Sequence, residues 1–273
     1  MSVIAEDYGV VLRSHRFGET SRILVFLTSR HGKLHAIAKG ARNPKNRFGA
    51  ALDILAEGSF VFYLKKDRDL QLIRSAELET FHEPLLRDAV RYHYGCAAAE
   101  FADRLVLGQE EGPDCLDALR QFLFFLESAP LPRLSALFKA YQLRLAGLQG
   151  YRPNLEGCLY CSKADRAAPG LSFSIHDGAL VCPRHRSPLQ DAVPLSPDAL
   201  QVLMDLVASD LPMTPLGWKP ALDPLLTRVV EGFLRFHIDG YRGLKSLKSL
   251  QSLTRNGSLA STRGLLAGGE KAC

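Results

Sequence analysis

Three cysteines and one histidine in the second half of the chain have the spacing of a structural metal site. Two residues separate Cys158 from Cys161, and after a gap of twenty residues the same spacing separates Cys182 from His185. A two-residue gap lets both side chains of a pair reach one ion, and four soft sulfur and nitrogen ligands favour closed, tetrahedral Zn²⁺. Because no coordination position stays open, the pattern predicts one structural zinc ion rather than catalysis at a metal.

The surroundings of this cluster leave alternatives open. The segment at about 150–194 is rich in proline, glycine and cysteine and looks too polar to build its own core, so bound zinc would supply folding free energy. Unrelated buried thiols are the alternative to a metal site, and His176 is the alternative to His185 as the fourth ligand. The other cysteines are interpreted as two core thiols and one exposed thiol: Cys96, Cys115 and Cys273.

A second concentration of reactive side chains is cationic and lies near the N-terminus. The window 13–47 holds nine basic residues and a single acid, Glu19, which gives it a net charge of +8 when the whole chain carries +5. Charge this one-sided is costly in a compact fold unless it faces a polyanion, and DNA or RNA is the obvious one. One of the nine is Arg30. We predict that the other eight bind DNA: Arg13, Arg16, Arg22, Lys33, Lys39, Arg42, Lys45 and Arg47.

Four of these cations lie in the longest expected loop of this region, residues 39–51, around two glycines and a proline. A flexible basic loop can follow a phosphate backbone, and Phe17 and Phe48 could stack on bases or could equally cover the end of a barrel. The alternative, that the charges only solubilise the surface, fits poorly because such surfaces usually mix both signs. A second basic group either extends a DNA path or is a solvated helix end: Arg242, Lys245, Lys248 and Arg255.

The sequence contains no set of residues typical of a reaction centre. Neither a G-x-x-x-x-G-K phosphate loop nor a G-x-S-x-G nucleophile turn is present. His31 and His35 are interpreted as turn and strand residues. The acids of the helical region are interpreted as solvated faces and caps: Glu100, Asp103, Glu110, Glu111, Asp114 and Asp117. We therefore expect a binding protein rather than an enzyme.

The elements that must position these residues change character along the chain. Five short stretches alternate or are β-branched, with turn residues between them: 8–15, 22–28, 33–38, 60–64 and 70–74. Five strands in about eighty residues indicate a small antiparallel barrel or sandwich, and an OB-fold fits. Apolar residues then recur at helical spacing in five stretches: 85–107, 113–127, 134–148, 197–209 and 224–239.

The predicted fold class is therefore α+β. We expect residues 1–81 to form an OB-fold DNA-binding domain and 82–253 a helical domain that carries the cysteine insert. Residues 254–273 are rich in glycine and serine and are not expected to fold alone. With 47% hydrophobic and 23% charged residues, no apolar run of about 18 residues and no secretion signal, the chain is expected in the cytoplasm, associated with the nucleoid.

Several segments together resemble one known family. The N-terminal run carries a Gly18-Glu19-x-Ser21 turn, a turn at 28–32 and a Lys39-Gly40-Ala41-Arg42 motif that leads into the basic loop. A helical middle, the cysteine insert and a closing RFHIDGYRGLKSLKSL segment follow in the same order as in the RecO family of recombination mediators. His185 stands where a cysteine would be expected in that family.

The resemblance implies an N-terminal OB-fold, a helical C-terminal domain and a zinc-bearing insert. It implies binding to single- and double-stranded DNA, annealing of complementary strands, and help in loading RecA onto DNA coated by single-strand-binding protein, within the RecF pathway. The implied protein partners are RecR and the acidic C-terminal tail of single-strand-binding protein. Two other functions stay open from the residues alone: a metal-dependent enzyme acting on nucleic acid, and an RNA-binding regulatory module with a zinc knuckle.

Overall fold

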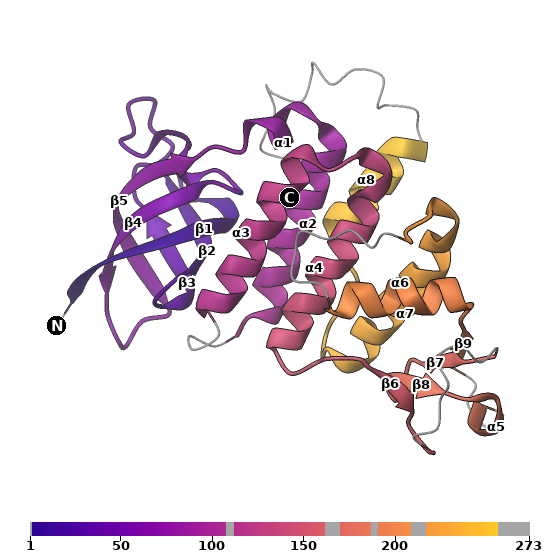
Figure 1. The fold of residues 1–273 in the computed structure, drawn as a ribbon. Helices are drawn as coiled ribbons and strands as arrows, with labels where there is room; N and C mark the ends of the chain where they lie inside the picture. Colours follow the sequence, from indigo (N-terminus) through magenta and orange to yellow (C-terminus); the bar gives the residue numbers. More distant parts are fainter. Residues whose placement is uncertain (1, 108–111, 162–169, 187–190, 209–216, 256–273) are drawn as a thin grey trace. The chain divides into compact units, whose positions relative to one another are not determined.

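The N-terminal region is a closed five-stranded barrel. A computed structural model describes residues 2–107, 112–161, 170–186, 191–208 and 217–255 (Figure 1). The strands are β1 (Val3–Phe17), β2 (Ser21–Thr28), β3 (Gly32–Ala38), β4 (Glu57–Leu64) and β5 (Leu70–Thr80). They close in the order β1-β2-β3-β5-β4, with β3 and β5 parallel and the other pairs antiparallel. The predicted OB-fold is therefore confirmed.

Strand β1 belongs to both halves of the barrel because it is long. Its first half pairs with β4 and its second half with β2, and Gly9 faces both Gly58 and Thr28. A Cβ atom on Gly9 would lie 2.5 Å from the Leu27 carbonyl oxygen, so only glycine fits this crossing. A bulge follows Val11, and four consecutive residues are buried, from Gly9 to Leu12. The expected simple alternation over 8–15 was wrong at this point.

The barrel core is built around three phenylalanines. The ring centroids of Phe26 and Phe60 lie 4.7 Å apart, and those of Phe26 and Phe62 lie 5.3 Å apart at a near-perpendicular angle. All three side chains are fully buried, together with Leu24 and Ile73. Such contacts hold the strands in one register, because a slip of one residue would turn the core face outward.

Four helices belong with the barrel. They are α1 (Glu83–Arg87), α2 (Ala89–Leu105), α3 (Gly112–Ser128) and α8 (Lys245–Arg255). The single helix expected from 85 is two helices, because Asp88 adopts an extended conformation and its carboxylate caps α2 through the Val90 and Arg91 amides. Helix α8 was not among the five predicted helical stretches, although it begins within the expected helical domain. It begins where Glu100 of α2 accepts bonds from the Lys245 and Ser246 amides.

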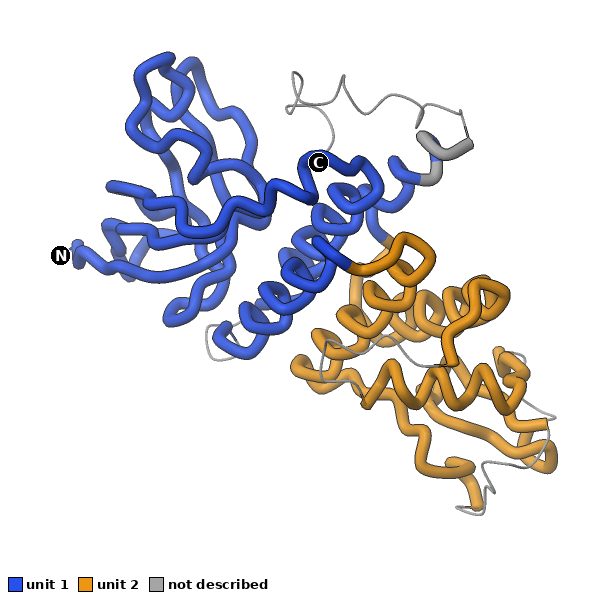
Figure 2. The backbone as a smooth tube through the Cα atoms, turned by 45° about the horizontal axis from the view of Figure 1, so that its top comes forward, with its two compact units in different colours: residues 1–128, 244–273 blue, residues 129–243 orange. Residues whose placement is uncertain are grey.

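The chain divides into two compact units (Figure 2). The first comprises Met1–Ser128 and Leu244–Cys273, and the second comprises Ala129–Gly243. Helices α1 to α3 therefore form one unit with the barrel, although the sequence changes from strand to helix periodicity near residue 81. None of the described helices is long and apolar enough to cross a lipid bilayer.

The second unit combines helices with a small sheet. Its helices are α4 (Leu134–Leu148), α5 (Pro183–Arg186), α6 (Pro197–Ala208) and α7 (Asp223–His237). The sheet has the order β6-β8-β7-β9 and is formed by β6 (Asn154–Cys158), β7 (Ser172–Ser174), β8 (Ala179–Val181) and β9 (Ala192–Pro194). The three long helices agree with the predictions, and the sheet occupies the cysteine insert.

The insert has an apolar core, which the sequence was expected to lack. Its buried side chains come from all four strands and the segments beside them: Leu155, Leu171, Phe173, Leu180, Val181 and Val193. The Phe173 ring lies 6.1 Å from the Phe233 ring of α7, and His237 Nε2 lies 3.0 Å from the Ile175 carbonyl oxygen. The expectation was wrong because a few buried apolar side chains, at least one from each strand, are enough to form this small core within a segment of polar average composition.

Candidate nucleic-acid interface and metal centre

The four predicted metal ligands lie together. Their ligand atoms all lie within 4.8 Å of one another. The Sγ atoms of Cys161 and Cys182 are 3.9 Å apart, and His185 Nδ1 lies 3.3 Å from Cys182 Sγ and 3.5 Å from Cys158 Sγ. Zinc–sulfur bonds of about 2.3 Å in a tetrahedron place two sulfurs about 3.8 Å apart, and a sulfur and a nitrogen about 3.5 Å apart. The Cys3His group therefore fits one tetrahedral ion.

Local backbone geometry favours the thiolate form that a metal needs. Cys158 ends β6, and the Cys182 amide donates a hydrogen bond to its sulfur at 3.4 Å. Burial alone would raise the pKa of the Cys158 thiol, but bonds from the amides of Cys182 and Tyr160 and from His185 lower it to about 6. A thiol with a lowered pKa releases fewer protons on binding metal than an ordinary cysteine thiol does.

The alternative fourth ligand, His176, lies elsewhere in the insert. Its side chain is exposed, its Nδ1 atom is 3.3 Å from Asp177 Oδ1, and its backbone amide donates to the carboxylate of Asp191. The imidazole also contacts the Phe236 ring, with centroids 4.6 Å apart. His185 rather than His176 therefore completes the ligand set.

The predicted DNA-binding cations fall into two groups on the barrel. Strand pairing places Arg16 opposite Arg22 and Arg22 opposite Ala38, the residue before Lys39, so these side chains share one barrel end. The loop after β3 adds three more cations there. We call this end the cationic rim: Arg16, Arg22, Lys39, Arg42, Lys45 and Arg47. Arg13 and Lys33 lie outside the rim.

Arg13 and Lys33 both contact one acid of helix α2. The Arg13 guanidinium lies 3.4 Å from one carboxylate oxygen of Asp103, and Lys33 Nζ lies 3.8 Å from the other. Lys33 also donates to the Asp103 carbonyl oxygen at 2.6 Å, at the C-terminal end of α2. Burial lowers the pKa of the Lys33 ammonium, and Asp103 counteracts this effect. These two cations connect the barrel to α2 through Asp103. Their contact with DNA stays a prediction.

Two cations of the rim organise its loops. Arg42 donates to the carbonyl oxygens of Gly18 and Glu19 at 3.2 and 2.8 Å, and its amide donates to Thr20 at 2.9 Å. This fastens the β1–β2 turn to the loop after β3. The Arg22 guanidinium lies 3.2 Å from Asp53 in the same loop.

The remaining side chains of the rim face solvent. Arg16, Lys39, Lys45 and Arg47 are all exposed, and the Arg47 guanidinium lies 5.1 Å from the centre of the Phe48 ring. Phe48 itself is only 4% exposed and covers the end of the barrel core, whereas Phe17 is 50% exposed. Of the two aromatic residues, Phe17 is therefore the one that can reach a base.

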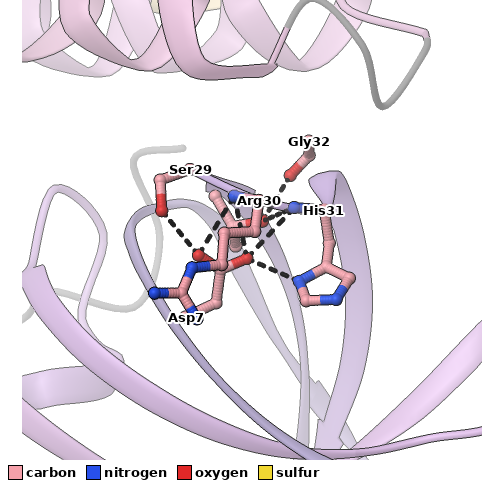
Figure 3. A network of polar contacts seen from close by, with 6 residues as sticks. Asp7, Ser29, Arg30, His31 and Gly32 are labelled. Atoms are coloured by element: carbon pink, nitrogen blue, oxygen red, sulfur yellow. Dashed lines mark hydrogen bonds and ion pairs between the residues drawn. The ribbon is translucent and has the colours of Figure 1, made fainter.

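The opposite end of the barrel is held by a buried carboxylate that the sequence analysis did not single out (Figure 3). Asp7 accepts bonds from Ser29 Oγ at 2.7 Å, from the Arg30 and His31 amides at 3.1 Å, and contacts His31 Nδ1 at 2.7 Å. Burial would raise the pKa of Asp7, but these bonds from Ser29, His31 and Arg30 lower it. A Cβ on Gly112 would lie 2.5 Å from Gly32, so this turn packs against the start of α3.

A second buried network was also missed. Glu57, at the start of β4, accepts hydrogen bonds from Tyr8 of β1 and Arg120 of α3, and its Oε2 lies 3.4 Å from His82 Nε2. His82 Nδ1 lies 2.6 Å from Glu127 Oε1. We call these five residues the helix-facing network, because they join the barrel to α1 and α3. The members lie far apart in sequence, so no local motif could have identified them.

Burial and pairing shift the pKa values of Glu57 and His82 in opposite directions. Burial would raise the pKa of Glu57, but bonds from His82, Tyr8 and Arg120 lower it to about 2. Burial would lower the pKa of His82, but its two carboxylate neighbours raise it. Pairing therefore favours the ionised carboxylate of Glu57 and the protonated form of His82, against the effect of burial on each.

The acids of the helices have structural contacts. Glu100 holds the start of α8, Asp103 binds Arg13 and Lys33, and Asp117 lies 3.8 Å from Arg120. Asp114 is exposed in the first turn of α3, and Glu110 and Glu111 lie outside the described residues. Within the described ranges, the Cys3His group is the one set of histidine, cysteine or acidic residues placed to hold a metal ion.

Most of the second basic group lies on helix α8, whereas we expected it in the chain after the last helix. Lys245 and Lys248 are exposed on the first turns of α8, and the side chain of Arg255 lies outside the described residues. Cations at the N-terminal end of a helix gain nothing from its dipole. Lys245 and Lys248 therefore form a solvated helix end, at the N-terminal end of α8, where the helix dipole does not favour them. Cys96 and Cys115, in contrast, are core residues as predicted, and Cys273 lies outside the described residues.

Comparison with known families matches nearly the whole chain. Residues 1–81 match the family described as "Recombination protein O N terminal", and residues 86–248 match "Recombination protein O C terminal".

Individual relatives give the same result over similar lengths. A DNA repair protein RecO of Streptomyces coelicolor is 30% identical over 269 residues, which cover 92% of this chain and 100% of the relative. One of Thermobifida fusca is 32% identical over 90% of this chain and 97% of its own. One of Bifidobacterium adolescentis is 33% identical over 75% and 82%, respectively.

Proposed function

The chain belongs to the recombination protein O family, and from this premise we propose that it is a DNA-binding mediator of recombination repair. The observation that carries the proposal is the cationic rim, where six basic side chains gather at one end of an OB-fold. OB-folds bind nucleic acid by combining a positive groove that follows the backbone with aromatic side chains on which bases stack. The protein acts in this proposal without a reaction centre of its own.

The residues of the rim would have different roles in binding DNA. Arg16, Lys39, Lys45 and Arg47 are exposed and would bind phosphates, and Phe17 would stack on a base. Arg42 would contribute mainly by holding the β1–β2 turn, which carries Phe17, in place. Arg13 and Lys33 would add positive potential while remaining bound to Asp103.

Family membership supports the finer activities and partners. The protein would bind single- and double-stranded DNA, anneal complementary strands, and help load RecA onto DNA coated by single-strand-binding protein. Its partners would be RecR and the acidic C-terminal tail of single-strand-binding protein, and its place would be the cytoplasm, at the nucleoid. Binding assays in solution with each purified partner test the partner assignments separately from DNA binding.

The Cys3His group would hold one structural zinc ion. The distances among its sulfur and nitrogen atoms support this assignment, because they match those around tetrahedral zinc. Bound zinc would restrain the two ligand-bearing turns, or knuckles, at 158–161 and 182–185, and with the second of them α5. Metal analysis of protein purified without added zinc should find about one ion per chain, and absence of metal would contradict the assignment.

Salt dependence of DNA affinity tests the rim directly. For single-stranded DNA, each phosphate contact adds about −0.7 to the slope of log K against log salt. The triple variant Lys39→Ala, Lys45→Ala, Arg47→Ala should therefore reduce the slope by about 2, measured by fluorescence anisotropy of a labelled oligonucleotide. A matched RNA strand in competition tests polymer preference, and stronger binding to RNA would redirect the proposal.

The control for this experiment lies at the other end of the barrel. Arg30 is exposed there, in the turn held by Asp7, so Arg30→Ala removes a surface cation of the same module without touching the rim. We expect its slope to match that of the unmodified protein. Equal losses in the two variants would mean that overall charge, and not the rim, determines affinity.

A further inference from the structure

The cysteine insert has a core that does not depend on its metal ligands. Phe173, Leu180 and Val193 are fully buried, and Phe173 and His237 connect the sheet to helix α7. The ligands lie at the ends of β6 and β8 and on α5, beside this core. Loss of the ion would therefore release the two knuckles and α5, while the sheet keeps its contacts with α7. A site of this kind can lose its metal without unfolding.

The three sulfurs differ in access to solvent. Cys158 and Cys182 are 2% and 9% exposed, whereas Cys161 is partly exposed and follows Leu159 and Tyr160, which are 45% and 52% exposed. The Sγ atom of Cys161 lies 3.9 Å from that of Cys182. A disulfide needs about 2.05 Å, and the exposed turn before Cys161 is the segment that can move to close this gap.

We propose that Cys161 and Cys182 form a peroxide-sensitive thiol pair whose oxidation empties the metal site. This inference rests on the zinc assignment made above. The Cys161 thiolate attacks hydrogen peroxide, the O–O bond breaks, and a sulfenic acid and hydroxide form. The Cys182 thiolate then attacks the Cys161 sulfur and displaces a second hydroxide. Two thiolates have lost two electrons to form one disulfide, and protonation of both hydroxides gives two waters.

The disulfide removes two of the four ligands. Cys158 and His185 remain, and two ligands cannot hold zinc in a closed tetrahedral site. Without the ion, His185 no longer holds α5 to the two cysteine pairs through the metal, and α5 keeps the bonds from its His185 and Arg186 amides to the Cys182 carbonyl oxygen and the contact between the His185 and Tyr160 rings. Reduction of the disulfide in the presence of zinc restores the original site, so the change is reversible as long as oxidation stops at the disulfide.

The experiment uses the full chain loaded with one equivalent of Zn²⁺ and treated with hydrogen peroxide. A zinc-binding dye measures the release of metal, and mass spectrometry of a non-reduced digest identifies the disulfide. We expect about one ion released per chain, a peptide linking Cys161 to Cys182, and unchanged helix content by circular dichroism. Dithiothreitol and zinc should return the ion to the protein.

Two variants separate this pair from other thiols. Cys161→Ser removes a zinc ligand as well as the attacking thiolate, so the digest is its readout and should contain no linked peptide, whereas Cys115→Ala, which removes a core thiol, should behave like the unmodified chain. Retention of zinc by the unmodified chain, or a disulfide that involves Cys158 or Cys273 instead, would overturn the proposal. Metal content measured before peroxide tests the zinc assignment independently, and the digest of a metal-free chain still tests the thiol pair.

Discussion

The two sides of the barrel use charge in different ways. At the cationic rim, basic side chains lie at a free end of the barrel and several of them face solvent. On the helix-facing side, Lys33, His82 and Arg120 are bound to buried or partly buried acids. Exposed cations contribute little to stability and are available to a ligand, whereas a buried ion pair that loses one member destabilises the fold strongly. In the proposed function, the positive charge of the N-terminal region would therefore serve DNA recognition at the rim, while on the helix-facing side it holds the barrel to its helices.

The largest expected effect comes from removing the central acid of the helix-facing network. Glu57→Ala leaves Arg120 and His82 without the carboxylate of Glu57, and we expect a loss of about 3–5 kcal/mol in the free energy of unfolding, measured with urea. Glu77→Ala, an exposed acid on β5, is the control and should change stability by less than about 0.5 kcal/mol. Similar losses in both variants would remove the distinction between the two sides of the barrel.

Acid titration tests the same network without changing its shape. The folded pKa of Glu57 is lowered to about 2 from its usual 4.5, so its contribution is present above pH 4.5 and is lost as the pH falls towards 2. We expect stability to decrease in this window by an amount on the order of 3 kcal/mol. Glu57→Gln should flatten this limb of the curve, and an unchanged limb would assign the acid sensitivity to other carboxylates.

The histidine of the network should act in the opposite direction. The folded pKa of His82 is raised, so its contribution is complete below the usual histidine pKa of 6.5 and is lost as the pH rises through the folded value. His82→Gln should remove this alkaline decrease while keeping most of the acid limb. Chemical unfolding measured from pH 6 to pH 9 checks the sign.

A smaller loss of stability is expected from a change in the turn at the other end of the barrel from the rim. Asp7→Asn keeps the size of the side chain but removes the charge that accepts bonds from Ser29, Arg30 and His31, and we expect a cost of about 1–3 kcal/mol. DNA affinity and its salt slope should stay unchanged, because this turn faces α3 and not the rim. A reduced slope in Asp7→Asn would show that the turn belongs to the binding surface.

The smallest effect on stability is expected at the rim. Replacing Lys39, Lys45 and Arg47 with alanine should change the free energy of unfolding by less than about 0.5 kcal/mol each, since their side chains are exposed. The same variant should show the largest change in the salt slope of DNA binding. A large loss of stability without a change in slope would reverse the roles of the two sides.

Local patterns predicted what depends on local chemistry. The paired two-residue spacing of Cys158, Cys161, Cys182 and His185 predicted that these four side chains lie together in a group that could hold a metal ion, and strand alternation predicted the barrel. Pairings between distant residues were out of reach, because Lys33 and Asp103 lie 70 positions apart and Glu57 and Arg120 lie 63 apart. The cations could be counted from the sequence, but which of them are neutralised depends on which helix covers which strand.

Boundaries were missed where a single side chain decides them. Asp88 divides one periodic stretch into two helices by capping the second, and Glu100 provides the cap that allows α8 to start at Lys245. Short strands such as β7 and β8 were also missed, because three residues are too few to establish a period.

The contact between Glu100 and the start of α8 has a consequence for synthesis on the ribosome. The unit that contains the barrel is discontinuous in sequence, because it includes residues from Leu244 onward, whereas Ala129–Gly243 is one uninterrupted stretch. The carboxylate of Glu100 cannot bind the Lys245 and Ser246 amides until those residues have emerged. The nascent chain therefore starts the unit that contains the barrel first and completes it last, after every residue of the other unit has been translated.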